Sequence, residues 1–162
     1  MKPIHRIALV LFLSLNPIMV AADDAADIER ILLGIAKAAD EGNWTLLEQK
    51  FADNVILNQL SLFDETGDRV TEDDVIAGWA DLLPRFDRTE HRITDVEILA
   101  ISRITARASS RFHAIYHRNG RIWEQTGRLH YLLKREGDAW VVTALDTTPE
   151  WQSGRLADLL AD

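Results

Sequence analysis

The sequence has no cysteine, and this absence excludes several kinds of site at once. Without thiols there can be no disulfide, no thiol nucleophile, no cysteine-ligated zinc and no lipid anchor on cysteine. The 8 glycines form neither a phosphate-binding loop nor a nucleophile elbow. We therefore expect no cofactor and no bound metal.

Long apolar runs are also scarce, and the clearest one covers residues 7–15. Lys2 and Arg6 precede this run, Pro17 breaks it, and small residues follow up to Ala22. A membrane-spanning helix needs roughly 20 apolar residues, so the run is too short to be an anchor. The pattern predicts a cleaved export signal over residues 1–22 and a periplasmic or secreted protein. A buried N-terminal helix fits the positive flank and the proline less well.

Positive charge is in short supply, with 18 Lys and Arg against 26 Asp and Glu. Removal of residues 1–22 would also remove Lys2 and Arg6, so the net charge of −8 would become −10. Such a field repels phosphate backbones and anionic lipid, which argues against nucleic acid or membrane partners. Residues 23–162 have the length of one domain.

Helical spacing marks the first part of this domain. Apolar residues 28, 31, 32, 35 and 39 share one helix face, and Gly42 is expected to end that helix. Asn43 can cap a short second helix that carries Trp44, Leu47 and Phe51.

A strand over residues 55–63 and a turn over residues 64–68 follow. Thr71 and Asp74 resemble a capping box, which opens a third helix that Pro84 closes.

The region after Pro84 is predicted to be antiparallel sheet. Asn119-Gly120 is a strong hairpin signal and places Tyr116 opposite Trp123. A two-residue turn at Gly137-Asp138 would place Leu129 opposite Asp146, so that Asp146 joins the apolar face. A three-residue loop would instead place Asp146 on the opposite face of the sheet. Helices followed by antiparallel strands indicate an α+β domain, in which helices cover a curved sheet around a cavity.

Histidines raise the question of metal. His113 and His117 lie four residues apart on one strand, so they are about 13 Å apart and cannot chelate one ion. With His130 they fall on the polar face, where solvent or an interface suits them.

His91 differs because it lies on the same face of its strand as the apolar Ile93. Val96 has the opposite parity, which predicts a bulge near Thr94 and Asp95 that would turn His91 inward. Asp40 is also unusual, because it lies at a helix end whose dipole disfavours an anion. By themselves, these patterns favour a hydrogen-bonded histidine of the core or its rim at position 91. They favour an Asp40 that is simply one of the polar residues at the end of the helix.

Four segments together resemble the SnoaL-like branch of the nuclear transport factor 2-like superfamily. They are "AADEGNWTLLEQKFADNVIL", "VIAGW", "TEHRITDVEI" and "GRLHYLLKREGDAWVV". The resemblance covers residues 27–146 and implies a cone of three helices on a curved sheet, commonly paired into dimers. The superfamily includes scytalone dehydratase, a lindane dehydrochlorinase, ketosteroid isomerase and polyketide cyclases.

The resemblance implies roles for three residues. In the dehydratase and the dehydrochlorinase an Asp orients a His that abstracts a proton, and Asp40 and His91 match those positions. Asp146 approximately matches an Asp that cyclases carry on the last strand. Substrate-polarising tyrosines have no clear counterpart, and Leu129 stands where the family usually has tyrosine.

The resulting hypothesis is a lyase or isomerase that acts on a small apolar molecule. The reaction would be isomerisation, dehydration, elimination or cyclisation, with His91 as base. The alternative is a non-catalytic binding or dimerisation module in which Asp40 and His91 form a structural pair. The expected pocket lining is Trp44, Phe112, Tyr116, Trp123, Leu129 and Tyr131.

Two further expectations concern the outside of the domain. A homodimer is expected through the outer sheet face, which carries Arg111, His113, Arg128 and His130. Residues 148–162 are expected to form a short amphipathic helix, which would cover the mouth of the pocket.

Overall fold

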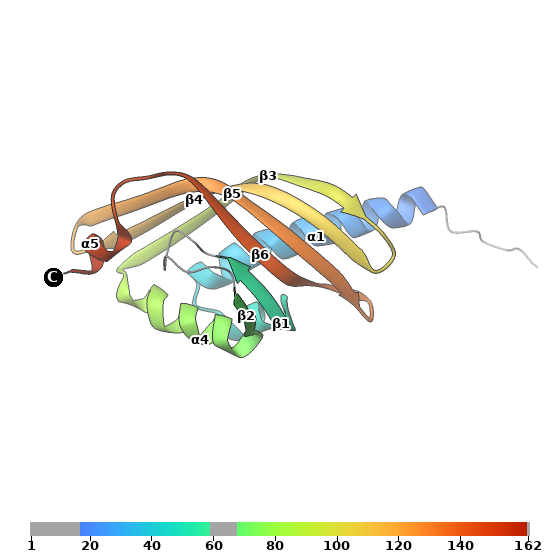
Figure 1. Ribbon diagram of the computed structural model, residues 1–162, viewed down its shortest axis with the longest axis horizontal. Helices are drawn as coiled ribbons and strands as arrows, with labels where there is room; N and C mark the ends of the chain where they lie inside the picture. Colours follow the sequence, from blue (N-terminus) through green and yellow to red (C-terminus); the bar gives the residue numbers. More distant parts are fainter. Residues whose placement is uncertain (1–16, 59–67, 162) are drawn as a thin grey trace, which may run out of the picture.

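The computed structural model describes residues 17–58 and 68–161 as helices packed along one face of a curved six-stranded sheet (Figure 1). The strand order is β2-β1-β6-β5-β4-β3. This is the predicted α+β architecture. The elements in chain order are α1 (Pro17–Asp40), α2 (Trp44–Glu48), β1 (Phe51–Asn58), β2 (Asp68–Thr71), α4 (Glu72–Leu82), the 3-10 turn η1 (Leu83–Arg85), β3 (Arg88–Ile101), β4 (Thr105–Arg118), β5 (Arg121–Glu136), β6 (Ala139–Gln152) and α5 (Leu156–Leu160).

Helix α1 ends where the sequence predicted, and its end positions Asp40. Ile28 and Leu32 bury one face of the helix against the sheet. Gly42 then adopts a φ of +63°, a conformation that suits glycine, and reverses the chain. The Asn43 side chain accepts a hydrogen bond from the backbone N–H of Leu46 and caps α2.

The capping box of α4 is also confirmed. The Thr71 hydroxyl accepts from the Asp74 N–H, while the Asp74 carboxylate accepts from the Thr71 N–H. Pro84 lies in the 3-10 turn that ends the helix. Trp79 and Leu82 of this helix face the space between α4 and the sheet.

The first strand differs from the prediction. Phe51 begins β1 instead of extending α2, because it is 4% exposed and pairs with Val142 of β6. The β1–β6 pairing is parallel, so the sheet is not wholly antiparallel. The predicted end of the strand, residues 59–63, lies outside the described residues, as does the turn up to residue 67.

The predicted export signal falls mostly on residues that the structure does not describe. Residues 1–16 lie outside the described part, and residues 17–22 form the start of α1. Among the described helices, none combines the length and apolarity needed to cross a membrane.

Strands β4 and β5 pair in the predicted register around Asn119-Gly120, with Tyr116 opposite Trp123. The β5–β6 register is different. A bulge at Thr143 places Ala144 opposite Leu132 and Asp146 opposite His130. The prediction that Asp146 joins the inner face is therefore wrong, because one extra residue in β6 moves the residues after it to the opposite face, up to a second register shift between Pro149 and Trp151.

The C-terminal prediction is corrected as well. Strand β6 continues to Gln152, and only Leu156–Leu160 are helical. Leu156 and Leu159 pack in one cluster with Trp123 and Tyr116. Helix α5 therefore seals the end of the core and contributes no residue to the pocket wall.

Candidate active site

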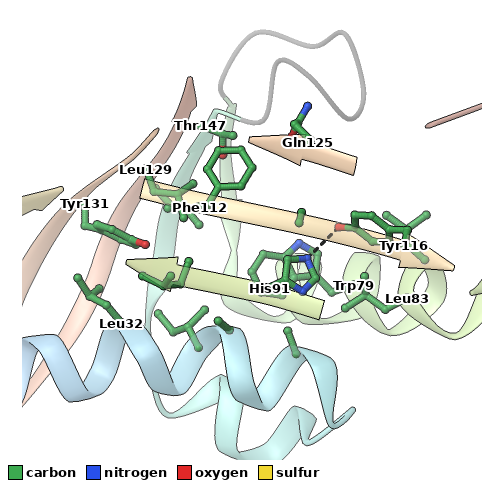
Figure 2. A pocket seen from close by; sticks show the side chains of 17 residues that line it. Leu32, Trp79, Leu83, His91, Phe112, Tyr116, Gln125, Leu129, Tyr131 and Thr147 are labelled. Carbon is green, nitrogen blue, oxygen red and sulfur yellow. Dashed lines mark hydrogen bonds between the residues drawn. The ribbon is translucent and has the colours of Figure 1, made fainter. Parts of the chain in front are cut away.

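A cavity of about 100 Å³ lies between the inner face of the sheet and the helices α1 and α4 (Figure 2). Its floor is apolar and comes from the helices, with Leu32, Ile35 and Ala36 on α1 and Trp79 and Leu82 on α4. The sheet contributes aromatic and polar side chains. These are His91, Phe112, Tyr116, Gln125, Tyr131 and Thr147.

The described lining contains no Lys, Arg, Asp or Glu. A buried charge without a partner is strongly unfavourable, so such a wall selects against charged ligands. An apolar cavity of roughly 150 Å³ holds benzene in another protein. At about 100 Å³ the space here is smaller than that cavity, so it suits a neutral molecule no larger than one small ring.

His91 reaches the cavity because β3 pairs regularly with β4 up to a bulge. The register shifts between Thr94 and Glu97, and Asp95 adopts a φ of +52°. This is the predicted bulge. It lets His91 and Ile93 face inward while the later part of β3 follows the opposite parity.

Asp40 lies behind His91 and accepts three hydrogen bonds. One carboxylate oxygen accepts from His91 Nδ1 at 2.6 Å and from the Thr89 hydroxyl at 2.9 Å. The other oxygen accepts from the His91 backbone N–H at 2.7 Å. The predicted contact between Asp40 and His91 is therefore present, and His91 lines the cavity.

The charge state of Asp40 follows from these contacts. Burial raises the pKa of Asp40, but the hydrogen bonds and charge of His91 and the bond from Thr89 together outweigh burial. The net effect holds the pKa below its usual value. Asp40 is thus a carboxylate at neutral pH and can only accept, so the Nδ1 of His91 must carry a proton.

The other ring nitrogen of His91 faces Tyr116. Nε2 lies 2.9 Å from the Tyr116 hydroxyl, the contact drawn as a dashed line in Figure 2. In a neutral imidazole with Nδ1 protonated, Nε2 is an acceptor, so the phenol O–H donates to it. Burial, helped by the negative charge of Asp40, raises the pKa of Tyr116 and keeps the phenol protonated.

Tyr116 is held rigidly. Its ring centroid lies 4.7 Å from that of Phe86 and 5.3 Å from that of Trp123, and the residue is 2% exposed. The His91 ring meets it edge-on, with an interplanar angle of 88°. Close packing against these two rings restrains the phenol beside His91.

A second polar group, formed by Tyr131 and Ser110, is separate from this chain of contacts. The two hydroxyls are 3.1 Å apart and buried. Burial raises the pKa of Tyr131 to about 12, although the bond to Ser110 opposes this. Gln125 and Thr147 are also buried in the lining, and the Gln125 amide nitrogen donates to Gln152. These groups can orient a neutral polar atom of a ligand.

The predicted lining is right for four aromatic or aliphatic residues and wrong for two. Phe112, Tyr116, Leu129 and Tyr131 lie in the wall. Trp44 packs at the edge of the core, and Trp123 lies behind Tyr116, where its indole N–H donates to the Gly154 carbonyl. The alternation of side chains along the strands identified the residues that face inward. It could not show how deep each of them lies within the core.

Asp146 does not join the site. Its neighbours Leu145 and Thr147 line the cavity, so Asp146 points to the opposite face. Sequence reasoning missed Gln125 and Thr147. Gln125 could have been found, because it shares the inward parity of Trp123 and Leu129 in the hairpin register.

His113 and His117 lie on the outer face of the sheet, in an ion pair or near one. His113 Nε2 is 2.8 Å from Glu124, and His117 Nε2 is 3.7 Å from Glu90. Within the described part of the chain, no group of three metal-ligating side chains comes together.

The chain is similar in fold to several solved structures. A protein from Kribbella flavida, Kfla4162, is 22% identical, with 86% of this chain and 98% of that chain covered and a TM-score of 0.79. A provisionally named scytalone dehydratase from Novosphingobium aromaticivorans is 14% identical, with 84% and 90% covered and a TM-score of 0.74. A hexachlorocyclohexane dehydrochlorinase, LinA, is 10% identical, with 85% and 92% covered and a TM-score of 0.70.

Sequence comparison gives the family. No curated protein sequence matches this chain significantly. The model of the SnoaL-like domain matches residues 20–146, which is most of the chain and includes Asp40, His91 and Tyr116. At these levels of identity, the solved structures establish the fold and the domain match establishes the family. The chain belongs to the SnoaL-like domain family of the nuclear transport factor 2-like fold.

Proposed function

We propose that this protein is a lyase or isomerase that removes a proton from a small neutral molecule held in the cavity. The observation that carries the proposal is the chain of hydrogen bonds Asp40–His91–Tyr116 at the wall of an otherwise uncharged pocket. His91 is the base, and Asp40 holds its Nδ1 and stabilises the imidazolium that forms.

The electrostatics favour this role. A protonated imidazole next to an ionised Asp40 is a neutral pair, so the reaction separates little charge in a poorly solvated site. A carbanion or enolate that forms nearby gains from the adjacent imidazolium. The same arrangement serves dehydration, elimination of a leaving group or migration of a double bond.

The structural neighbours support this chemistry without establishing it. Their names include a dehydrochlorinase and a provisionally named scytalone dehydratase, and both names denote eliminations. The lining excludes charged groups, so the proposed substrate class is a neutral ring compound with an acidic C–H beside a carbonyl or a leaving group.

Two cyclic ketones test the proposal because both give the same conjugated enone, which absorbs ultraviolet light. One is β-hydroxycyclohexanone, which must lose water, and the other is β,γ-unsaturated cyclohexenone, which must shift its double bond. The wild type should accelerate at least one reaction. His91→Ala and Asp40→Asn should each lose roughly 10²–10⁴-fold, the usual contribution of a general base.

Controls distinguish a protein that uses His91 as a catalytic base from one that only binds the ligand. His113→Ala removes a histidine that pairs with a carboxylate outside the cavity and should leave the rates unchanged. Equal turnover by wild type and His91→Ala would refute the base. Ligand-induced NMR shifts at the cavity without turnover by any variant would support the carrier.

Location and assembly are further parts of the proposal. We infer export with cleavage near Ala22, and Asp24 suits an N-terminus that remains. Asp24 is 9% exposed, pairs with Arg135 and lies 3.3 Å from the indole nitrogen of Trp140. Intact mass of the native protein tests this, and retention of residues 1–22 would contradict it.

A homodimer through the outer face of the sheet is inferred from the side chains on that face. Arg111 and Arg128 both pair with Glu150, while Ile122 and Leu132 are 54% and 46% exposed. Exposed aliphatic groups beside charged ones can form the apolar centre and the polar rim of an interface. Light scattering that shows only monomer at micromolar concentration would refute the dimer.

A further inference from the structure

The single acceptor site of neutral His91 is already occupied. Nδ1 donates to Asp40, so only Nε2 carries a free lone pair, and the Tyr116 hydroxyl lies 2.9 Å from it. A substrate proton can reach Nε2 directly only if this hydrogen bond is broken. The packing of Phe86 and Trp123 against the Tyr116 ring opposes that movement.

We propose that Tyr116 is a catalytic residue that relays the proton between substrate and His91. This inference rests on the proposed function and names the atom that touches the substrate. Tyr116 lines the cavity, so its oxygen can face both the ligand and the imidazole. A phenol oxygen that donates its own proton still has lone pairs with which to accept another.

The relay balances in protons and electrons. The substrate C–H bond breaks, its proton bonds to the Tyr116 oxygen, and the original phenol proton moves to His91 Nε2. The electron pair left on carbon forms an enolate or expels the leaving group. The imidazolium then returns its proton to the Tyr116 oxygen, and the phenol passes a proton to the leaving group or to another carbon.

The surroundings of Tyr116 favour a relay over a tyrosinate base. The phenol is buried and lies near the negative charge of Asp40, and both raise the pKa of the hydroxyl. In a relay the phenol gains one proton as it loses another, so it stays neutral throughout. The positive charge forms on His91, beside the carboxylate that stabilises it.

Tyr116→Phe separates the relay from direct abstraction, because the two mechanisms predict opposite results. The substitution keeps the ring and its packing but removes the oxygen, so Nε2 faces the cavity uncovered. A relay predicts a loss of at least about 10²-fold with both cyclic ketones. Direct abstraction by His91 predicts an unchanged or higher rate, and that result would overturn the relay while leaving the proposed function intact.

A solvent isotope effect gives a readout that a purely structural role would not change. The probe is β,γ-unsaturated cyclohexenone, deuterated at the carbon that loses its proton. In the relay an exchangeable phenol proton moves in the same step as C–H cleavage, so heavy water should slow the step that also shows the substrate deuterium effect. A substrate effect without a solvent effect on that step would overturn the relay.

The contact between Tyr116 and His91 can be observed directly, because Tyr116 and Tyr131 are the only two tyrosines of the sequence. Fluorotyrosine incorporated into Tyr131→Phe labels Tyr116 alone. Its fluorine NMR signal should shift when His91→Ala is added in a folded protein, because the phenol then loses the acceptor of its hydrogen bond. A signal that is indifferent to His91, in a protein that turns the ketones over, would overturn the relay. Absence of wild-type turnover would instead overturn the proposed function, and the relay with it.

Discussion

Asp40 accepts two hydrogen bonds from the same residue, one from the backbone N–H of His91 at 2.7 Å and one from its ring Nδ1 at 2.6 Å. The pair joins the end of α1 to the beginning of β3, a separation of 51 residues in sequence. The backbone bond does not depend on the imidazole. Asp40 therefore holds the fold together at this point as well as orienting the ring.

The first prediction follows from that double contact. Asp40→Ala would leave the His91 N–H and the Thr89 hydroxyl without their acceptor. Both donors are part-buried, so the loss for each should lie toward the low end of about 1–3 kcal/mol. Urea denaturation should show this loss. Glu124→Ala is the matched control, because it breaks an outer-face pair with His113 and should cost less than about 1 kcal/mol. Equal losses would contradict a structural role for Asp40.

The second prediction concerns acid. The folded state lowers the pKa of Asp40 below its usual value of 3.8, so the unfolded chain binds the proton more readily. The stability that this group contributes is complete above that value and disappears as pH falls through the lower folded pKa. The difference in unfolding free energy between the wild type and Asp40→Asn should therefore shrink below about pH 4. A difference that is constant down to strongly acidic pH would refute the assignment.

The third prediction tests the cavity. Ala36 lines the cavity, whereas Ala38 of the same helix is 0% exposed and packs in the hydrophobic core. Ala36→Leu should fill part of the empty space, weaken turnover of the cyclic ketones and leave stability nearly unchanged. Ala38→Leu should overpack the core and cost about 1–3 kcal/mol. Similar melting temperatures for the two variants would show that the cavity is not a usable space.

The fourth prediction concerns the approach of β5 to β6 beside the cavity. A Cβ on Gly127 would lie 2.3 Å from the Thr148 carbonyl oxygen and 2.9 Å from the Pro149 Cα, so backbone would have to move. Gly127→Ala should be strongly destabilising in thermal unfolding. Gly78→Ala in α4 meets nothing within 4 Å and should stabilise by up to about 1 kcal/mol. Tolerance of Gly127→Ala would mean that the two strands lie further apart.

The local parts of the fold were predictable from sequence. The capping box at Thr71 and the loop at Asn119-Gly120 depend on residues only a few positions apart, so their geometry follows from short-range hydrogen bonds and backbone preferences. The hairpin loop then determines the register of both strands. This is why the inward parity of Tyr116, Phe112 and Tyr131 follows from the sequence alone.

Long-range pairing decided what local patterns could not. Phe51 left the predicted helix because β6 offers it a pairing partner, Val142, that lies far away in sequence. The bulge at Thr143 has no strong local signal, yet it moved Asp146 to the outer face and Thr147 to the cavity. A single inserted residue changes the face of the side chains that follow it until the next register shift, and only the packed sheet determines where that residue goes.

At the site, too, some features follow from the sequence and others only from the tertiary structure. The sequence by itself determined that His91 faces inward, through the change of parity along β3, and resemblance to the family implied Asp40 as its partner. Tertiary structure alone brought the Tyr116 hydroxyl to the second nitrogen of His91 and placed Trp123 behind the phenol. Parity specifies the face on which a side chain lies, but a hydrogen bond between side chains on neighbouring strands depends on rotamer and depth. Those are decided by the packing of Phe86, Trp123 and α5 around the ring.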